Sequence, residues 1–259
     1  MKIALVQMLS QADKLENLAA VEKWTLQAAE LGAELIVFPE ATMKAFQSGR
    51  LDTVAEPIDG PWANKVRELA QELGVTIVVG MFCPADQRGD KNRVTNTLLV
   101  TGGADAKYDK IHTYDAFGYR ESDTVRAGDE IVVFQLDGRT IGVATCYDIR
   151  FPEQFKELAR RGAELIVVPA SWADGADKLR QWRLLTNARG LDSTSFIAAV
   201  GQARPPASEG GPTGIGHSAL ISPTGERLVE AGYDEELLVV DIDFDQVAEA
   251  RRALPVIEG

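Results

Sequence analysis

The chain has 259 residues, and its 39 acidic side chains outnumber its 27 basic ones to give a net charge of −12. This acidity argues against binding to nucleic-acid backbones or anionic membranes, because both are bound through clustered lysine and arginine. Two cysteines and two histidines exclude a disulfide framework and leave little material for a zinc site. Chemistry in this chain must therefore depend mostly on carboxylates and amines, with a thiol as the remaining candidate.

Strands and helices alternate through the first half of the chain. A β-branched run predicts a strand at 3–6, and apolar residues at helical spacing predict a helix at 14–31, which Gly32 ends. The continuous aliphatic run at 35–38 is typical of a strand buried on both faces. The pattern then predicts a helix at 64–73. Two strands follow, at 75–82 and 93–100, with a polar turn at 85–92 between them.

The second half continues this alternation. Strands at 131–134 and 141–145 flank the dipeptide Asp137-Gly138, which is a strong signal for a β-hairpin. Two helices and four strands follow, the helices at 153–161 and 178–191 and the strands at 165–168, 196–200, 218–221 and 237–240. Hairpins mixed with crossovers between helices favour two packed sheets that are covered outside by helices.

One decapeptide occurs twice. GAELIVFPEA at 32–41 returns as GAELIVVPAS at 162–171, with differences only at the seventh, ninth and tenth positions. Short aliphatic strands can resemble one another by chance, but the shared Gly-Ala-Glu entry and proline exit favour two related halves. Because no Pro/Ser-rich linker separates them, residues 1–259 are predicted to form a single domain.

No targeting or membrane segment is visible. The apolar run after Lys2 is too short for a signal peptide, and nowhere do about 18 apolar residues run together, so we expect a cytoplasmic protein. The stretch 204–212 is rich in proline and glycine and is predicted to be a mobile surface loop.

Three polar residues stand where active sites of α/β proteins are built, at the ends of predicted strands. Glu40 follows the strand at 35–38, Cys146 follows the strand at 141–145, and Lys110 precedes a loop. Partial burial after an apolar strand would suit the Glu40 carboxyl to general acid–base catalysis. Lys110 alone is unremarkable, and only in a constellation would it stabilise an oxyanion.

Cys146 is either a small buried side chain or a nucleophile. A nucleophilic cysteine needs a nearby base or positive charge, and the turn that follows Cys146 would leave a backbone N–H free to bind an oxyanion. A Cys–His pair with His112 or His217 is the alternative means of activation, whereas Cys83 is predicted to be a core residue. No H-x-x-x-H or C-x-x-C spacing is present, so no metal site is expected.

Together these residues resemble the motifs of the nitrilase superfamily, the carbon–nitrogen hydrolases with a Glu–Lys–Cys catalytic set. The resemblance covers nearly the whole chain, and its most specific segment is the one that contains the cysteine. Five segments carry it in order: the opening strand that ends at Gln7, FPE at 38–40, YDKIH at 108–112, CYDIRFPE at 146–153 and GHSALISPTGE at 216–226.

The resemblance implies a four-layer αββα sandwich, usually assembled as a homodimer through helices that cover the sheets. It makes Cys146 the nucleophile, Glu40 the general base and acid, and Lys110 the stabiliser of the oxyanion. Glu121 stands where amidases of the family carry a second glutamate, although a solvated loop charge is the alternative interpretation. The implied mechanism passes through a thioester and needs neither a cofactor nor a metal.

The cysteine segment looks most like the Nit-type amidase branch, which includes ω-amidases and deaminated-glutathione amidases acting on amides of small carboxylic acids. A small amide is therefore the expected substrate. Arg150 would bind a substrate carboxylate or, alternatively, form a structural ion pair with Glu153. Tyr147, Trp172 and Phe46 are the other candidates for contact with the substrate.

Three other functions stay open from sequence alone. The same site would suit hydrolysis of an N-carbamoyl group or of a nitrile, and a catalytically silent binding protein could keep the fold. Retention of all four charged and thiol residues argues against a silent protein. The segments 115–124 and 172–178 depart from the family pattern, so the resemblance does not identify the substrate.

Overall fold

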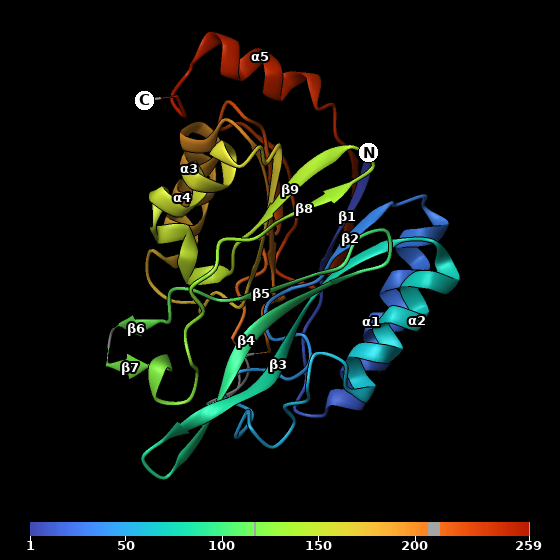
Figure 1. Cartoon of the computed structure of the whole chain (residues 1–259), viewed down its shortest axis with the longest axis vertical. Helices are drawn as coiled ribbons and strands as arrows, with labels where there is room; N and C mark the ends of the chain where they lie inside the picture. The colour runs from blue at the N-terminus through green and yellow to red at the C-terminus, as the bar shows by residue number, and fades with distance from the viewer. Residues whose placement is uncertain (117, 207–212, 259) are drawn as a thin grey trace.

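The computed structural model describes residues 1–116, 118–206 and 213–258, and it contains two six-stranded sheets that face each other (Figure 1). In spatial order, the first sheet consists of β14 (Glu236–Asp241), β1 (Lys2–Gln7), β2 (Leu35–Val37), β3 (Thr76–Arg88), β4 (Lys91–Thr101) and β5 (Ala106–Asp109). The second sheet consists of β13 (Arg227–Glu230), β12 (Ala219–Ile221), β11 (Phe196–Gly201), β10 (Leu165–Ala170), β9 (Arg139–Val143) and β8 (Val133–Leu136).

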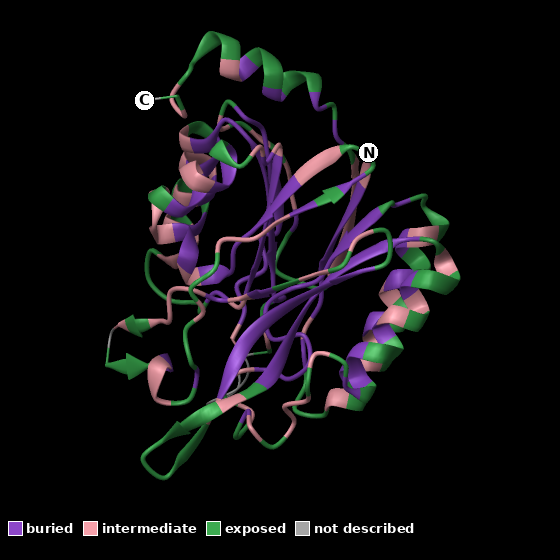
Figure 2. Ribbon diagram, viewed as in Figure 1, coloured by how far each residue is buried: buried purple, intermediate pink, exposed green. Residues whose placement is uncertain are grey.

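Two helices cover the outer face of each sheet. The first sheet carries α1 (Lys14–Glu30) and α2 (Pro61–Leu73), and the second carries α3 (Pro152–Arg160) and α4 (Lys178–Ser193). One face of each of these helices is exposed while the strands between them are largely buried, as Figure 2 shows. The expected four-layer αββα sandwich is therefore confirmed.

Side-chain alternation along the central strands creates the separate layers of the core. In β10, Leu165 and Val167 pack in the cluster between the two sheets, whereas Ile166 and Val168 pack in the cluster under α3 and α4. A strand with one apolar face would leave one of these interfaces without its side chains. Each central strand of a four-layer sandwich therefore needs apolar side chains on both faces, which explains the continuous aliphatic runs in the sequence.

The repeated decapeptides occupy equivalent places in the two sheets. β2 lies between the parallel strands β1 and β3, and β10 lies between the parallel strands β9 and β11. Each copy then leaves its strand at the carboxyl end, where Glu40 follows the first and Ser171 follows the second. The Ser171 N–H donates to Glu40 Oε2 at 2.7 Å, so the two halves meet at these positions.

The structure differs from the sequence predictions at the ends of several elements. The polar segment 85–92, predicted to be a turn, is mostly strand, because β3 and β4 continue as an exposed ribbon whose tip is at Gly89 and Asp90. The helix α5 (Asp245–Ala253) was not predicted, since only Val247 and Ala250 are buried and its apolar signal is weak. The Asp137-Gly138 hairpin is confirmed, with positive φ at both residues.

Two further expectations concern the surface. No helix in the described ranges has the length and apolarity needed to cross a bilayer. Within the predicted loop 204–212, residues 207–212 lie outside the described part of the chain.

Candidate active site

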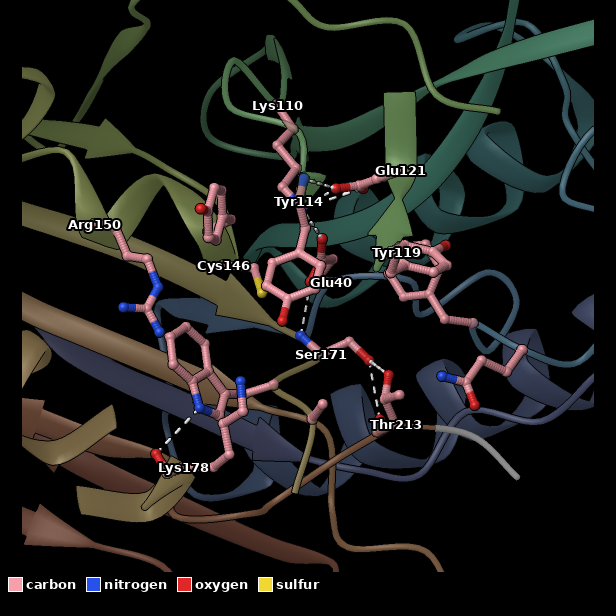
Figure 3. A pocket seen from close by; sticks show the side chains of 15 residues that line it. Glu40, Lys110, Tyr114, Tyr119, Glu121, Cys146, Arg150, Ser171, Lys178 and Thr213 are labelled. Atoms are coloured by element: carbon pink, nitrogen blue, oxygen red, sulfur yellow. Dashed lines mark hydrogen bonds and ion pairs between the residues drawn. The ribbon is translucent and has the colours of Figure 1, made fainter. Parts of the chain in front are cut away.

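Four side chains singled out by the sequence, Glu40, Lys110, Glu121 and Cys146, line one pocket at the carboxyl ends of the sheet strands (Figure 3). The pocket has a volume of about 190 Å³. Its inner wall is charged, while aromatic side chains supply much of the remainder. The fold therefore brings these four residues together at the strand ends, as expected.

Glu40 is held by a tight turn after β2. Ala41, the next residue, has a φ of 60°, and Thr42 Oγ1 donates to the Pro39 carbonyl at 2.8 Å. Gly80 on β3 allows this turn to approach the sheet, because a Cβ there would lie 2.7 Å from both Ala41 N and Pro39 O. The Glu40 side chain is only 1% exposed as a result.

Lys110 lies between two carboxylates. Its Nζ is 3.0 Å from Glu40 Oε1 and 2.9 Å from Glu121 Oε2, and all three side chains are almost fully buried. Burial alone would lower the pKa of the Lys110 ammonium, but the two carboxylates raise it well above its usual value. The lysine therefore stays charged at any working pH.

Glu121 belongs to the short 3₁₀ helix η1 (Glu121–Asp123), which follows the small hairpin of β6 (Asp115–Ala116) and β7 (Tyr119–Arg120). Its backbone N–H donates to the Tyr114 carbonyl at 3.1 Å, and the Tyr114 N–H donates back to Glu121 Oε2 at 2.6 Å. With 2% exposure it is not a solvated loop charge.

Cys146 opens a second 3₁₀ helix, η2 (Cys146–Arg150), in a left-handed conformation with a φ of 46°. Thr145 and Asp148 cap this turn, and Thr145 N–H donates to Asp148 Oδ2 at 2.8 Å. Burial and the neighbouring Glu40 carboxylate raise the pKa of the Cys146 thiol well above its usual value, against an opposing effect of Lys110. The resting group is thus a thiol beside a carboxylate.

Neither histidine lines the pocket. His112 Nδ1 lies 2.8 Å from Asp148 Oδ1, and its ring stacks on Phe151. His217 Nδ1 lies 3.1 Å from Glu230 Oε1. The geometry therefore favours activation of the cysteine by carboxylate over a Cys–His pair. Cys83 is buried in the core under α1 and α2, as predicted.

Asp148 connects the two segments that carry the cysteine and the lysine. Its side chain accepts hydrogen bonds from the Tyr108 hydroxyl at 2.5 Å and from the His112 backbone N–H at 2.9 Å. Because Tyr108 and His112 flank Lys110, this single buried carboxylate fixes the lysine segment relative to the cysteine turn. The YDKIH and CYDIR motifs are therefore neighbours in space.

The four predicted substrate contacts, Tyr147, Arg150, Trp172 and Phe46, also line the pocket. The Arg150 guanidinium lies 5.2 Å from the Trp172 ring and donates from Nη2 to Gln181 Oε1 at 2.7 Å. In the described ranges Arg150 forms no ion pair with Glu153 or another carboxylate. The alternative prediction of a structural ion pair with Glu153 is therefore wrong.

Sequence reasoning missed several residues of the pocket. Lys178, at the start of α4, lines it together with Tyr114 and Tyr119. Burial and the nearby Arg150 lower the pKa of Lys178. Asn96 lies behind the carboxylates and was also missed. A lysine near a helix start or a polar residue inside a strand has no motif of its own, so only tertiary contacts identify these residues.

Within the described residues, no group of three or more His, Cys, Asp or Glu side chains is arranged to hold a metal ion.

Comparison with known proteins agrees with this geometry. A family model described as carbon-nitrogen hydrolase matches residues 2–252. A protein named as a hydrolase from Mycobacterium tuberculosis (strain H37Rv) is 52% identical, with 100% of this chain and 95% of the relative covered. An omega-amidase of Xenopus tropicalis is 31% identical, with coverages of 98% and 93%.

The solved structures include an amidase from Nesterenkonia sp. AN1, in a variant whose active-site cysteine carries an acrylamide adduct. It matches with a TM-score of 0.78 and 28% identity, covering 98% of each chain. Another structure of this amidase is described as a member of the nitrilase superfamily. The chain studied here belongs to the carbon-nitrogen hydrolase family, within that superfamily, and is an enzyme of that class.

Lys110→Gln tests the charge balance of the buried cluster. The substitution removes the cation that two buried carboxylates share, so the free energy of unfolding should fall by about 3–5 kcal/mol in chemical denaturation. The double variant Lys110→Gln/Glu121→Gln removes one of the two carboxylates and should recover part of the loss. A double variant no more stable than the single one would contradict the assigned balance. Lys65→Gln, in an exposed ion pair, is the control and should change little.

Proposed function

We propose that this enzyme hydrolyses the amide bond of a small carboxylate-bearing amide to a carboxylic acid and ammonia, through a thioester on Cys146. The observation that carries the proposal is a buried thiol beside a carboxylate, with an ammonium fixed in the same pocket. The related omega-amidase and the cysteine adduct of the bacterial amidase are consistent with this chemistry.

In the first half-reaction, Glu40 accepts the proton of the Cys146 thiol while the sulfur attacks the amide carbonyl. Lys110 Nζ donates to Glu40 Oε1 at 3.0 Å and to both oxygens of Glu121, at 2.9 Å and 3.2 Å. The longer of the two bonds to Glu121 is the one that gives way, so that this N–H turns to the developing oxyanion. The backbone N–H after Cys146 is the second donor. The tetrahedral intermediate collapses as the protonated Glu40 gives its proton to the leaving nitrogen, and ammonia departs.

In the second half-reaction, Glu40 removes a proton from water, which attacks the thioester carbonyl. The same donors stabilise the second oxyanion, and the sulfur leaves with a proton from Glu40. Glu121 transfers no proton in either half-reaction, and its ion pair with Lys110 holds the ammonium in place. Each proton taken up is returned within the cycle, so the residues of the pocket suffice for the reaction.

Two cations provide for an anionic end of the substrate. Arg150 and Lys178 line the pocket with Trp172, whose indole N–H donates to the Lys178 carbonyl at 3.2 Å. The hydrogen bond from Nη2 to Gln181 fixes one edge of the guanidinium and leaves its other N–H donors for a carboxylate. Aromatic walls from Tyr114 and Tyr147 suit a short apolar linker between amide and carboxylate.

Ammonia release from a substrate panel tests this function. We expect ω-amides and deaminated peptides to react faster than N-carbamoyl acids or nitriles, and Cys146→Ala to lower the rate to background. Cys83→Ala, which removes the other buried thiol, should retain activity. Fastest turnover of N-carbamoyl acids, with carbon dioxide released alongside ammonia, would favour that alternative. Full activity in Cys146→Ala would exclude the thioester mechanism.

Arg150→Gln tests the anionic end of the substrate. Loss of hydrogen bonds to a charged group should raise KM for a carboxylate-bearing amide about tenfold or more, while KM for a neutral amide of the same length stays nearly unchanged. Arg180→Gln, on the exposed side of α4, is the matched control. An equal rise in KM for both substrates would show that Arg150 supports the fold and does not select the carboxylate.

We further propose that residues 1–259 form one domain that works as a cytoplasmic homodimer. A hydrogen bond from Ser218 N to Gln7 Oε1 supports joint folding of the halves. Leu184 and Leu191 on α4 are 61% and 44% exposed, which suits pairing of this outer helix layer with a second copy. Light scattering should give twice the 28.1 kDa of one chain, and fractionation should find the activity in the cytosol. A monomer mass or a membrane-bound fraction would contradict these assignments.

A further inference from the structure

Asn96 on β4 touches three residues of the buried cluster and has no role in the mechanism above. Its Nδ2 lies 2.7 Å from Glu40 Oε1 and 3.4 Å from Glu121 Oε1, and its backbone carbonyl accepts from Lys110 N–H at 2.9 Å. The side chain is 1% exposed. An amide NH₂ group has two N–H donors, so Asn96 can serve both glutamates at once.

The two oxygens of Glu40 have different surroundings. Oε1 accepts from Lys110 Nζ at 3.0 Å and from Asn96 Nδ2 at 2.7 Å, and these two bonds occupy both of its lone pairs. Oε2 accepts a hydrogen bond from Ser171 N–H at 2.7 Å, and the Cys146 thiol lies within hydrogen-bonding distance of the same carboxylate. Figure 3 shows the Cys146 sulfur next to this carboxylate, on the side of Ser171.

We propose that Asn96 is a positioning residue that, together with Lys110, fills Oε1 of Glu40 and so restricts proton transfer to Oε2. The inference depends on the proposed role of Glu40 as base and acid. In the attack step the S–H bond of Cys146 breaks and an O–H bond forms at Oε2, while the sulfur electron pair bonds to the carbonyl carbon. In the collapse step the C–N bond breaks and the Oε2 proton moves to nitrogen.

The orientation of Asn96 supports a functional role over simple packing. Its Oδ1 is buried without a hydrogen-bond partner in the described ranges. A buried acceptor left unpaired is unfavourable, and an apolar side chain of similar size would avoid that cost. Turning the amide to satisfy Oδ1 would direct an oxygen at two carboxylates. The role of Asn96 at this position is therefore to donate hydrogen bonds from Nδ2 to Glu40 and Glu121.

Asn96→Ala removes both donors. Because a hydrogen bond to the ionised carboxylate stabilises it against protonation, we expect kcat/KM to fall roughly tenfold or more and the acid limb of its pH profile to move to higher pH. The titratable groups around Glu40, which are Lys110, Glu121, Cys146 and Tyr119, remain in the variant. Asn92→Ala, at an exposed position of the same strand, is the matched control and should keep the wild-type profile.

Asn96→Asp keeps the shape of the side chain and serves if the alanine variant folds poorly. When ionised, the new carboxylate repels Glu40 and Glu121, whereas its protonated form supplies one O–H donor. Activity relative to wild type should therefore rise as the pH is lowered from 8 toward 5. Thermal unfolding of each variant separates this effect from loss of the fold.

Wild-type pH profiles in both Asn96 variants, with kcat/KM within twofold, would overturn the inference. Cys146→Ala, measured in parallel, separates this result from a failure of the proposed function. If Cys146→Ala is inactive and the Asn96 variants match wild type, only the role of Asn96 is wrong. If Cys146→Ala is active, the proposed function fails as well.

Discussion

The ammonium of Lys110 is the interaction on which the site depends. Two carboxylates buried side by side cannot both stay ionised unless a positive charge compensates them, and Lys110 lies 3.0 Å from one and 2.9 Å from the other. The groups come from three separate segments: the turn after β2, the segment after β5 and the helix η1. Two of these segments follow strands of the first sheet, and η1 lies between the two sheets in the chain, so the first half of the chain must fold before the charges can balance.

This arrangement places the proposed base, Glu40, beside the proposed nucleophile, Cys146, and keeps the Cys146 thiol protonated until substrate is attacked. Burial and Glu40 raise the pKa of the Cys146 thiol, so the proposed thiolate forms only as its proton moves to the carboxylate. A neutral thiol reacts slowly with oxidants and stray electrophiles, since the thiolate is the reactive form. The histidines are engaged elsewhere, His112 with Asp148 and His217 with Glu230. The scarcity of histidine in the composition is consistent with this chemistry.

Local patterns were sufficient to predict two packed sheets covered by helices and to single out Glu40 and Cys146, whereas the roles of Lys110 and Glu121 were predicted from the resemblance to the nitrilase superfamily. Aliphatic runs predict strands buried on two faces, and Glu40 and Cys146 follow such runs directly. Asn96 and Lys178 could not be found in this way, since one lies inside an ordinary strand and the other at the start of a helix. Their importance arises from contacts across the pocket, between residues distant in the chain. The helix α5 was missed for a different reason, since it buries only Val247 and Ala250.

The buried cluster also explains how charge moves without large rearrangement. Before attack, Glu40 and Glu121 share the single positive charge of Lys110, and the set of three carries a net negative charge. Once Glu40 takes the proposed proton, its negative charge disappears and a new one develops on the substrate oxygen. Lys110 then stabilises the oxyanion from where it already lies. Donors fixed in advance by the fold avoid the reorganisation that water would require, which is the main source of stabilisation for such transition states.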